Sequence, residues 1–183
     1  MYWKVETKMT ELFANNGQFI VFVHVLSAFI WIGGMIAMRV AVHPVIARGG
    51  VTAEQMLKSD VMVSMLEPKQ RLGVTLQTTG RLFNLVMPFI IILFATGLIM
   101  AIATGGHKGA LKTLFISKEI IWTIMAVNYT YMYVRRAKAW KLFEQGEVAL
   151  AKAKMKWIPN VLLPLNIVLG IVALWMGVSL RGL

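Results

Sequence analysis

Two ionisable residues, His24 and Lys118, lie within segments that are otherwise strongly apolar. Ionisable side chains are expensive to bury in such segments, so each of them is a candidate functional residue. An imidazole can ligate a haem iron, and the apolar wall around it excludes water. An ammonium group can pair with a haem propionate, or can take or give a proton at a bound tetrapyrrole. The structural alternatives are a hydrogen bond from His24 to neighbouring backbone and a Lys118 side chain that extends to the membrane surface.

Four apolar segments would position these residues. They cover residues 18–42, 82–104, 114–134 and 158–180. Each is long enough to cross a bilayer core about 30 Å thick, which takes roughly 20 residues. Backbone groups in lipid must be satisfied within the segment, so all four are expected to be α-helices. The sequence therefore predicts one all-α domain over residues 1–183, an integral membrane four-helix bundle.

The composition supports a membrane protein and excludes several classes of site. Of the 183 residues, 58% are hydrophobic and 15% are charged, against roughly 25% charged in soluble domains. The chain has no cysteine, which excludes disulfides, thiolate metal sites and iron–sulfur clusters. The net charge of +11 comes from basic residues near helix ends and not from one patch interleaved with aromatic residues, so nucleic-acid binding is not expected.

The basic residues also predict the topology. Most of them lie in the two long connections, residues 43–80 and 135–157, and the positive-inside rule places both connections in the cytoplasm. Both termini then lie outside, and the expected location is the cell inner membrane. The first span is too long for a signal peptide, so we expect it to be retained.

The connection over residues 43–80 is expected to carry an amphipathic helix on the cytoplasmic membrane surface. A candidate capping box, Thr52-x-x-Gln55, would start this helix, and Pro68 would end or kink it. The second connection is expected to be a helical hairpin with its tip near residues 144–147.

Helical spacing gathers the candidate residues on common faces. At a rise of 1.5 Å per residue, His24 lies about 9 Å and Lys118 about 6 Å below the outer ends of their spans, which run in the same direction. We therefore expect both at similar depth, turned toward a shared interior. Residues three or four apart share a helix face. The predicted inward stripes are His24, Ser27, Trp31, Gly34 and Met38; Lys118, Trp122, Met125, Tyr129 and Met132, with Asn128 beside them; and Asn166, Gly170, Ala173 and Gly177.

A haem b group suits this predicted interior, with His24 as axial ligand of the iron. Met100, at the outer end of the second span, is a candidate second axial ligand, and His107 is expected to be a solvated loop residue. The 13 methionines keep copper(I) open as an alternative metal, because thioether sulfur is a ligand that it prefers. Small residues that would border a flat macrocycle are Gly33, Gly34, Gly97 and Gly170.

The order of these motifs resembles that of the membrane protein superfamily that includes HemJ-type protoporphyrinogen oxidases and CopD-type copper-resistance proteins. The first span has a His-then-Trp-then-Gly pattern, the second an Arg at its entry and a Pro in its middle, and the third a leading Lys. Two departures indicate a divergent member: no Pro precedes Arg39, and Ser117 stands where HemJ proteins carry a histidine. The matching residues are His24, Trp31, Gly34, Arg39 and His43; Arg81, Pro88 and Gly97; Lys118, Tyr129, Tyr131 and Arg135; and Pro159 and Asn160.

This resemblance implies an oxidoreductase of the HemJ kind. Haem b would be bound through His24, with Trp31, Gly34 and Met100 around it, and Lys118 would be the catalytic residue. A porphyrinogen would be oxidised, and its electrons would pass to a quinone-linked acceptor. The CopD side of the superfamily implies copper transport or metal handling instead, and a non-catalytic membrane subunit is the third interpretation. Besides the lipid bilayer and a tetrapyrrole, a second copy of the chain is a candidate partner.

Overall fold

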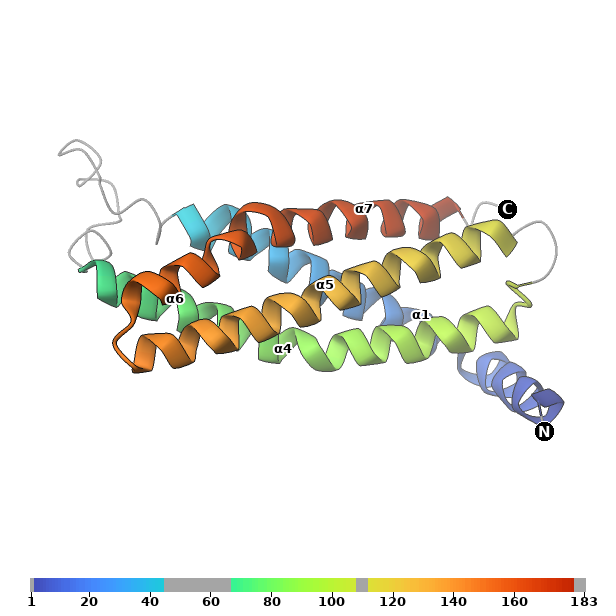
Figure 1. Cartoon of the computed structure of the whole chain (residues 1–183). Helices are drawn as coiled ribbons and strands as arrows, with labels where there is room; N and C mark the ends of the chain where they lie inside the picture. Colours follow the sequence, from blue (N-terminus) through green and yellow to red (C-terminus); the bar gives the residue numbers. More distant parts are fainter. Residues whose placement is uncertain (1, 45–66, 108–111, 180–183) are drawn as a thin grey trace. The chain divides into compact units, whose positions relative to one another are not determined.

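The computed structural model describes residues 2–44, 67–107 and 112–179, and every element in these ranges is a helix (Figure 1). The all-α fold class expected from the sequence is therefore confirmed. The elements are α1 (Tyr2–Ala37), η1 (Met38–Val42), α4 (Pro68–Ala103), α5 (Lys112–Glu144), α6 (Val148–Met155), η3 (Ile158–Leu162) and α7 (Leu163–Ser179), of which η1 and η3 are short π-helices.

Three stretches of the described chain are long and apolar enough to cross a membrane, namely Glu6–Val42, Pro68–Ala103 and Val148–Ser179. They contain the first predicted span and all but the last residue of the second and fourth. The third predicted span lies in α5, which has 33 residues but interrupts its apolar positions with polar ones. The polarity of α5, and not its length, separates it from the other three. Its polar residues include Lys118, Glu119 and Asn128.

Helix α1 begins well before the predicted span. It starts at Tyr2, and its backbone leaves the helical conformation at Asn16, where φ is −130° and ψ is 19°. Asparagine side chains compete for backbone hydrogen-bond partners, and Nδ2 of Asn16 donates to Leu12 O at 3.3 Å. The N-terminal part of α1 consequently turns away from the part that carries His24, as Figure 1 shows at the blue end of the chain.

Pro68 is the first residue of α4, and the helix that it was predicted to end or kink lies outside the described residues. Proline suits this position, since its missing N–H is one that the first turn leaves unpaired in any case. The backbone N–H of Glu67 donates to Oε1 of Gln70 at 2.9 Å, which is one half of a capping box. The amphipathic helix predicted around Thr52 and Gln55 lies outside the described residues.

The chain forms two compact units, and α1, α4, α5 and α7 each contribute to both. The first unit consists of Met1–Gly33, Val86–Val127 and Val168–Leu183, and the second of Gly34–Leu85 and Asn128–Ile167. In the first unit, a Cβ at Gly170 of α7 would lie 2.7 Å from the side chain of Ile32 on α1. Gly170 thus lets the two helices approach closely, as small residues do between membrane helices.

Polar side chains join the helices of the second unit from within. Nδ2 of Asn128 on α5 donates to Leu162 O and to Oδ1 of Asn166, each at 2.7 Å, and Asn166 is fully buried. The hydroxyl of Tyr129 donates to Phe83 O on α4. Because buried polar groups need hydrogen-bond partners, these bonds fix how α5 meets its neighbours in this unit.

Arg136 on α5 occupies a niche on α4. Its Nε donates to Leu76 O at 2.8 Å, and its guanidinium carbon lies 5.1 Å from the centre of the Trp140 ring. A Cβ at Gly80 would lie 2.2 Å from that guanidinium carbon. Glycine at position 80 is therefore what leaves room for the arginine.

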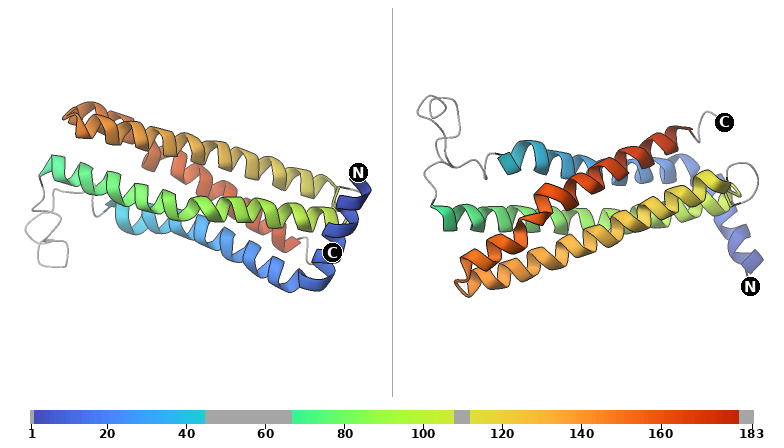
Figure 2. Two further views of the ribbon diagram at one scale, coloured as in Figure 1. Left: turned by 90° about the horizontal axis from the view of Figure 1, so that it is seen from below. Right: turned by 45° about the horizontal axis from the view of Figure 1, so that its top comes forward.

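Helices α5 and α6 form the hairpin predicted for the second connection. The turn lies between Glu144 and Val148, and Gly146 within it has a positive φ of 84°, which glycine adopts readily. Helix α6 runs back beside the end of α5 in both views of Figure 2. Nε of Arg135 on α5 donates to Lys154 O on α6 at 3.2 Å. The predicted hairpin tip is thereby confirmed.

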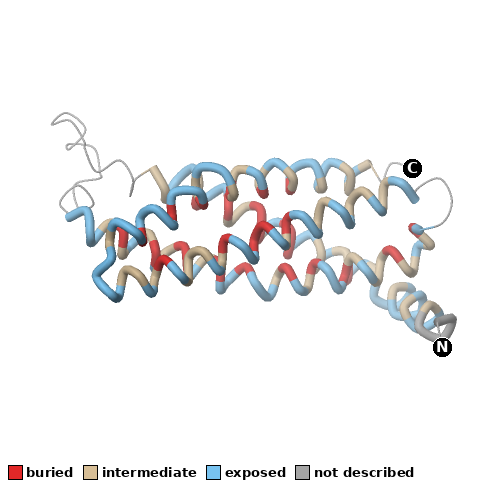
Figure 3. The backbone as a smooth tube through the Cα atoms, in the orientation of Figure 1, coloured by how far each residue is buried: buried red, intermediate tan, exposed pale blue. Residues whose placement is uncertain are grey.

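The helices expose large apolar residues on their outer faces and bury a few polar side chains within a mainly apolar core. Phe29 is 71% exposed and Trp175 is 72% exposed, whereas Ser27 is 1% exposed and Asn166 is completely buried. Figure 3 shows exposed positions alternating with buried ones along the helices. Soluble proteins bury most of their large aromatic rings, so these outer faces suit a lipid environment.

Gly80→Ala should destabilise the protein by about 1–3 kcal/mol, because the methyl group displaces the Arg136 guanidinium from its bond to Leu76 O. Gly33→Ala is the control, since its Cβ would meet only Phe29, at an ordinary 3.9 Å. Alanine is the better helix former by about 1 kcal/mol, so the control should be unchanged or more stable. Unfolding of the two variants in detergent, followed by circular dichroism, measures the difference. Equal effects of the two substitutions would show that Gly80 is not needed to make room for Arg136.

Candidate functional site

His24 lies on the part of α1 that belongs to the first unit, and it meets α4. Its Nδ1 is 2.9 Å from Oγ1 of Thr96. A Cβ at Gly97 would lie 3.3 Å from Cε1 of His24, so the glycine leaves space for the ring edge. The ring is half-buried. Two adjacent residues of α4 therefore position the imidazole.

Lys118 lies on α5, and its side chain is also half-buried. Its Nζ is 3.3 Å from the position that a Cβ of Gly177 on α7 would take. The ammonium is within electrostatic range of the His24 ring. The first unit thus brings together, from different helices, the two ionisable residues that the sequence analysis singles out. Among the described residues, no acidic side chain forms an ion pair with Lys118.

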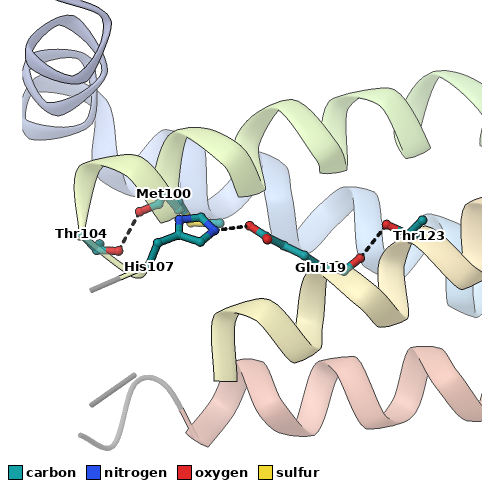
Figure 4. Close-up of polar contacts among 5 residues, drawn as sticks. All are labelled: Met100, Thr104, His107, Glu119 and Thr123. Atoms are coloured by element: carbon teal, nitrogen blue, oxygen red, sulfur yellow. Dashed lines mark hydrogen bonds and ion pairs between the residues drawn. The ribbon is translucent and has the colours of Figure 1, made fainter. Parts of the chain in front are cut away.

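The carboxylate that follows Lys118 in the sequence is paired elsewhere. Oε1 of Glu119 is 2.8 Å from Nε2 of His107, as Figure 4 shows, and both side chains are largely exposed. The pair ties the turn after α4 to α5. The exposure expected for His107 is confirmed. The pairing with Glu119 could not be predicted from the sequence, in which Glu119 is only one acidic residue within an apolar segment.

The other predicted cofactor residues lie at separate places. Trp31 is 1% exposed and lies two turns along α1 from His24. Gly34 lies ten residues after His24 on α1 and is the first residue of the second unit. Met100 is half-buried one turn after Thr96 on α4, and its carbonyl accepts the Thr104 hydroxyl at 2.7 Å (Figure 4). The i, i+4 spacing puts Met100 on the same side of α4 as Thr96.

Two of the glycines expected beside a macrocycle are covered by the chain itself. The ring of His24 lies over Gly97, and Ile32 and Met125 lie over Gly170. The interpretation of Gly170 as a cofactor neighbour is therefore corrected, because it serves helix packing. Gly97 leaves space for the imidazole of His24, which would bind the cofactor.

Neither the contact of Thr96 with His24 nor that of Trp122 with Phe94 could be predicted from the sequence. Trp122 lies one turn after Lys118 on α5, and its ring centre is 4.6 Å from that of Phe94. Its indole nitrogen is buried and has no hydrogen-bond acceptor among the described residues. A buried unpaired donor costs about 1–3 kcal/mol, so an acceptor on a bound group would stabilise this position.

The side chains around His24 and Lys118 are compatible with a haem. Among the residues that the structure describes, no three His, Cys, Asp or Glu side chains gather closely enough to hold a metal ion. A haem supplies its own nitrogen ligands in the macrocycle and needs only axial ligation from the protein. His24 has a second ring nitrogen, Nε2, for that purpose. The Lys118 ammonium and the Trp122 N–H are donors that haem carboxylates could satisfy.

Comparisons with protein-family models, with curated proteins and with solved structures found no match. The family resemblance and the activity it implies therefore stay predictions. The contacts around His24 and Lys118 are the basis for assigning a function.

Proposed function

We propose that this protein binds haem b in the inner membrane and is an oxidoreductase of the HemJ kind, acting on a porphyrinogen. The observation that carries the proposal is that His24 from α1 and Lys118 from α5 belong to the same unit and lie within electrostatic range of each other. An imidazole provides an axial ligand for iron, and an ammonium provides a charged partner for carboxylates.

In this proposal, α5 is the fourth membrane span and completes a four-helix bundle. Its apolar residues Ile120, Ile124 and Val127 are 55%, 47% and 65% exposed. Met125 and Tyr129, on the opposite side, are buried. The low hydropathy of α5 thus comes from its inward face, while its outward face is as apolar as a lipid-facing helix requires. With four spans, both termini lie outside and both long connections in the cytoplasm.

His24 would hold the haem through its second ring nitrogen, on the helix that also carries the buried Trp31. Met100, one turn after Thr96 on α4, would be a further residue to hold the haem. The haem, when bound, supplies reversible one-electron transfer between the substrate and a quinone-linked acceptor. The apolar residues around the imidazole keep water away from the iron.

Lys118 holds the anionic side of the tetrapyrrole and exchanges a proton with it. Its ammonium has no acidic partner among the described residues, and the Trp122 N–H one turn later is likewise unpaired there. Both donors lie on α5, while the ligating imidazole comes from α1. The substrate would therefore be held between two helices of the same unit.

His24→Ala should abolish haem binding, because it removes the axial ligand. The protein is produced with haem supplied and purified in mild detergent, and its Soret band is measured. His107→Ala is the control, since both His107 and its partner Glu119 are exposed; this variant should keep the band. A wild-type protein that purifies colourless, or with copper, would refute the haem assignment.

Lys118→Met should leave the Soret band in place and lower porphyrinogen oxidation by about 10²- to 10⁴-fold, the range of a lost acid–base group. Formation of the fluorescent porphyrin measures the rate. Lys112→Met is the control, because Lys112 is an exposed lysine at the start of the same helix. If both substitutions reduce the rate equally, Lys118 has no special part in the reaction.

The absence of cysteine makes the topology directly testable with single-cysteine variants. Thr10→Cys and Lys152→Cys replace exposed residues of α1 and α6. A membrane-impermeant maleimide should label the first variant in intact spheroplasts and the second only after permeabilisation. Labelling of Lys152→Cys in intact spheroplasts would show that α5 does not cross the membrane.

A further inference from the structure

The hydroxyl of Thr96 lies within hydrogen-bond distance of three atoms. Oγ1 is 2.7 Å from Ile92 O, 3.2 Å from Leu93 O and 2.9 Å from Nδ1 of His24. Thr96 is 9% exposed, so water has little access to replace these partners. A hydroxyl has one proton to donate and two lone pairs with which to accept. Where that one proton goes decides the state of the imidazole ring.

The proton must go to a carbonyl. A carbonyl oxygen can only accept a hydrogen bond. Because Oγ1 of Thr96 is 2.7 Å from Ile92 O, the two oxygens would repel each other unless the hydroxyl donates its proton to the carbonyl. With the proton directed at the carbonyl, the lone pairs of Oγ1 remain for the ring, and Nδ1 must carry a hydrogen.

A neutral imidazole with its hydrogen on Nδ1 has its lone pair on Nε2. Metal-binding histidines use this arrangement, in which one ring nitrogen donates to a fixed acceptor that orients the ring and raises the basicity of the other. Gly97 leaves room for the ring to lie against α4, because the side chain of a larger residue there would contact Cε1. Helix α4 thus sets both the tautomer and the orientation of His24.

We propose that Thr96 is a positioning residue that fixes His24 as the Nδ1–H tautomer and presents Nε2 as its ligating atom. The tautomer follows from the hydrogen bonds alone. The ligating role rests on the proposed function, in which Nε2 binds the haem iron. Thr96 itself touches neither the iron nor the substrate and acts through His24.

The tautomer is measured on the full chain in detergent, without haem, after isotopic labelling of the histidine ring nitrogens for NMR. The chain has three histidines, so His43→Gln and His107→Gln variants assign the signals of His24. At a pH where the ring is neutral, we expect an amine-type Nδ1 and an imine-type Nε2. An imine-type Nδ1 in the wild-type chain overturns the proposal.

Thr96→Val keeps the shape of the side chain and removes its hydroxyl, whereas Thr96→Ser keeps the hydroxyl. We expect the first variant to exchange between both tautomers and the second to retain the wild-type signals. Thr75→Val is the matched control, because the Thr75 hydroxyl makes the same kind of bond, to Arg71 O at 2.8 Å. A Thr96→Val chain whose His24 stays wholly in the Nδ1–H form shows that the threonine does not set the tautomer.

Haem titration of the same variants tests the ligating role separately. Thr96→Val should bind haem about 10- to 100-fold more weakly than wild type, the usual effect of losing such a partner. Thr96→Ser and Thr75→Val should bind as wild type does. Equal affinities of Thr96→Val and wild type overturn the positioning role. A wild-type chain that shows the fixed tautomer but binds no haem refutes the proposed function and leaves the assignment of the two ring nitrogens intact.

Discussion

The structure depends on one constraint, which is that polar side chains on helices with apolar outer faces must find their partners inside. Phe29 and Trp175 face outward. Inside, Asn128 pairs with Asn166, and Arg136 pairs with a backbone carbonyl of α4. An unpaired polar group in lipid is strongly unfavourable. Each polar side chain therefore restricts how its helix lies against the next one, within each of the two units.

Glycine supplies the space that these side chains need. A glycine inside a helix costs about 1 kcal/mol relative to alanine, so its use indicates a compensating interaction. In membrane helices, small residues are usually explained by close backbone approach, and Gly170 fits that explanation. Three other glycines instead accept the head of a polar side chain from a neighbouring helix. These pairs are Gly80 with Arg136, Gly97 with His24, and Gly177 with Lys118.

The inward faces could be predicted because helical periodicity is a local property of the sequence. Ser27, Trp31 and Met125 are expected inside and are buried. Helix ends could not be predicted in the same way, because apolar content marks only part of a helix. Helix α4 begins at Pro68, well before the apolar segment that starts at residue 82. The partner of His24 lies 72 residues away, and such pairs depend on how helices pack, which no local pattern contains.

The surroundings of Lys118 favour a ligand over a purely structural role. Its Nζ lies against Gly177, close to the end of α7 at Ser179, where the helix dipole favours a cation by about 0.3–1 kcal/mol. An ammonium has three N–H donors. Leaving a buried donor without an acceptor costs about 1–3 kcal/mol, which is more than the stabilisation that the helix dipole provides. Glu119, the adjacent carboxylate, is engaged by His107. In the proposed function, a carboxylate on a bound tetrapyrrole would supply the missing acceptor.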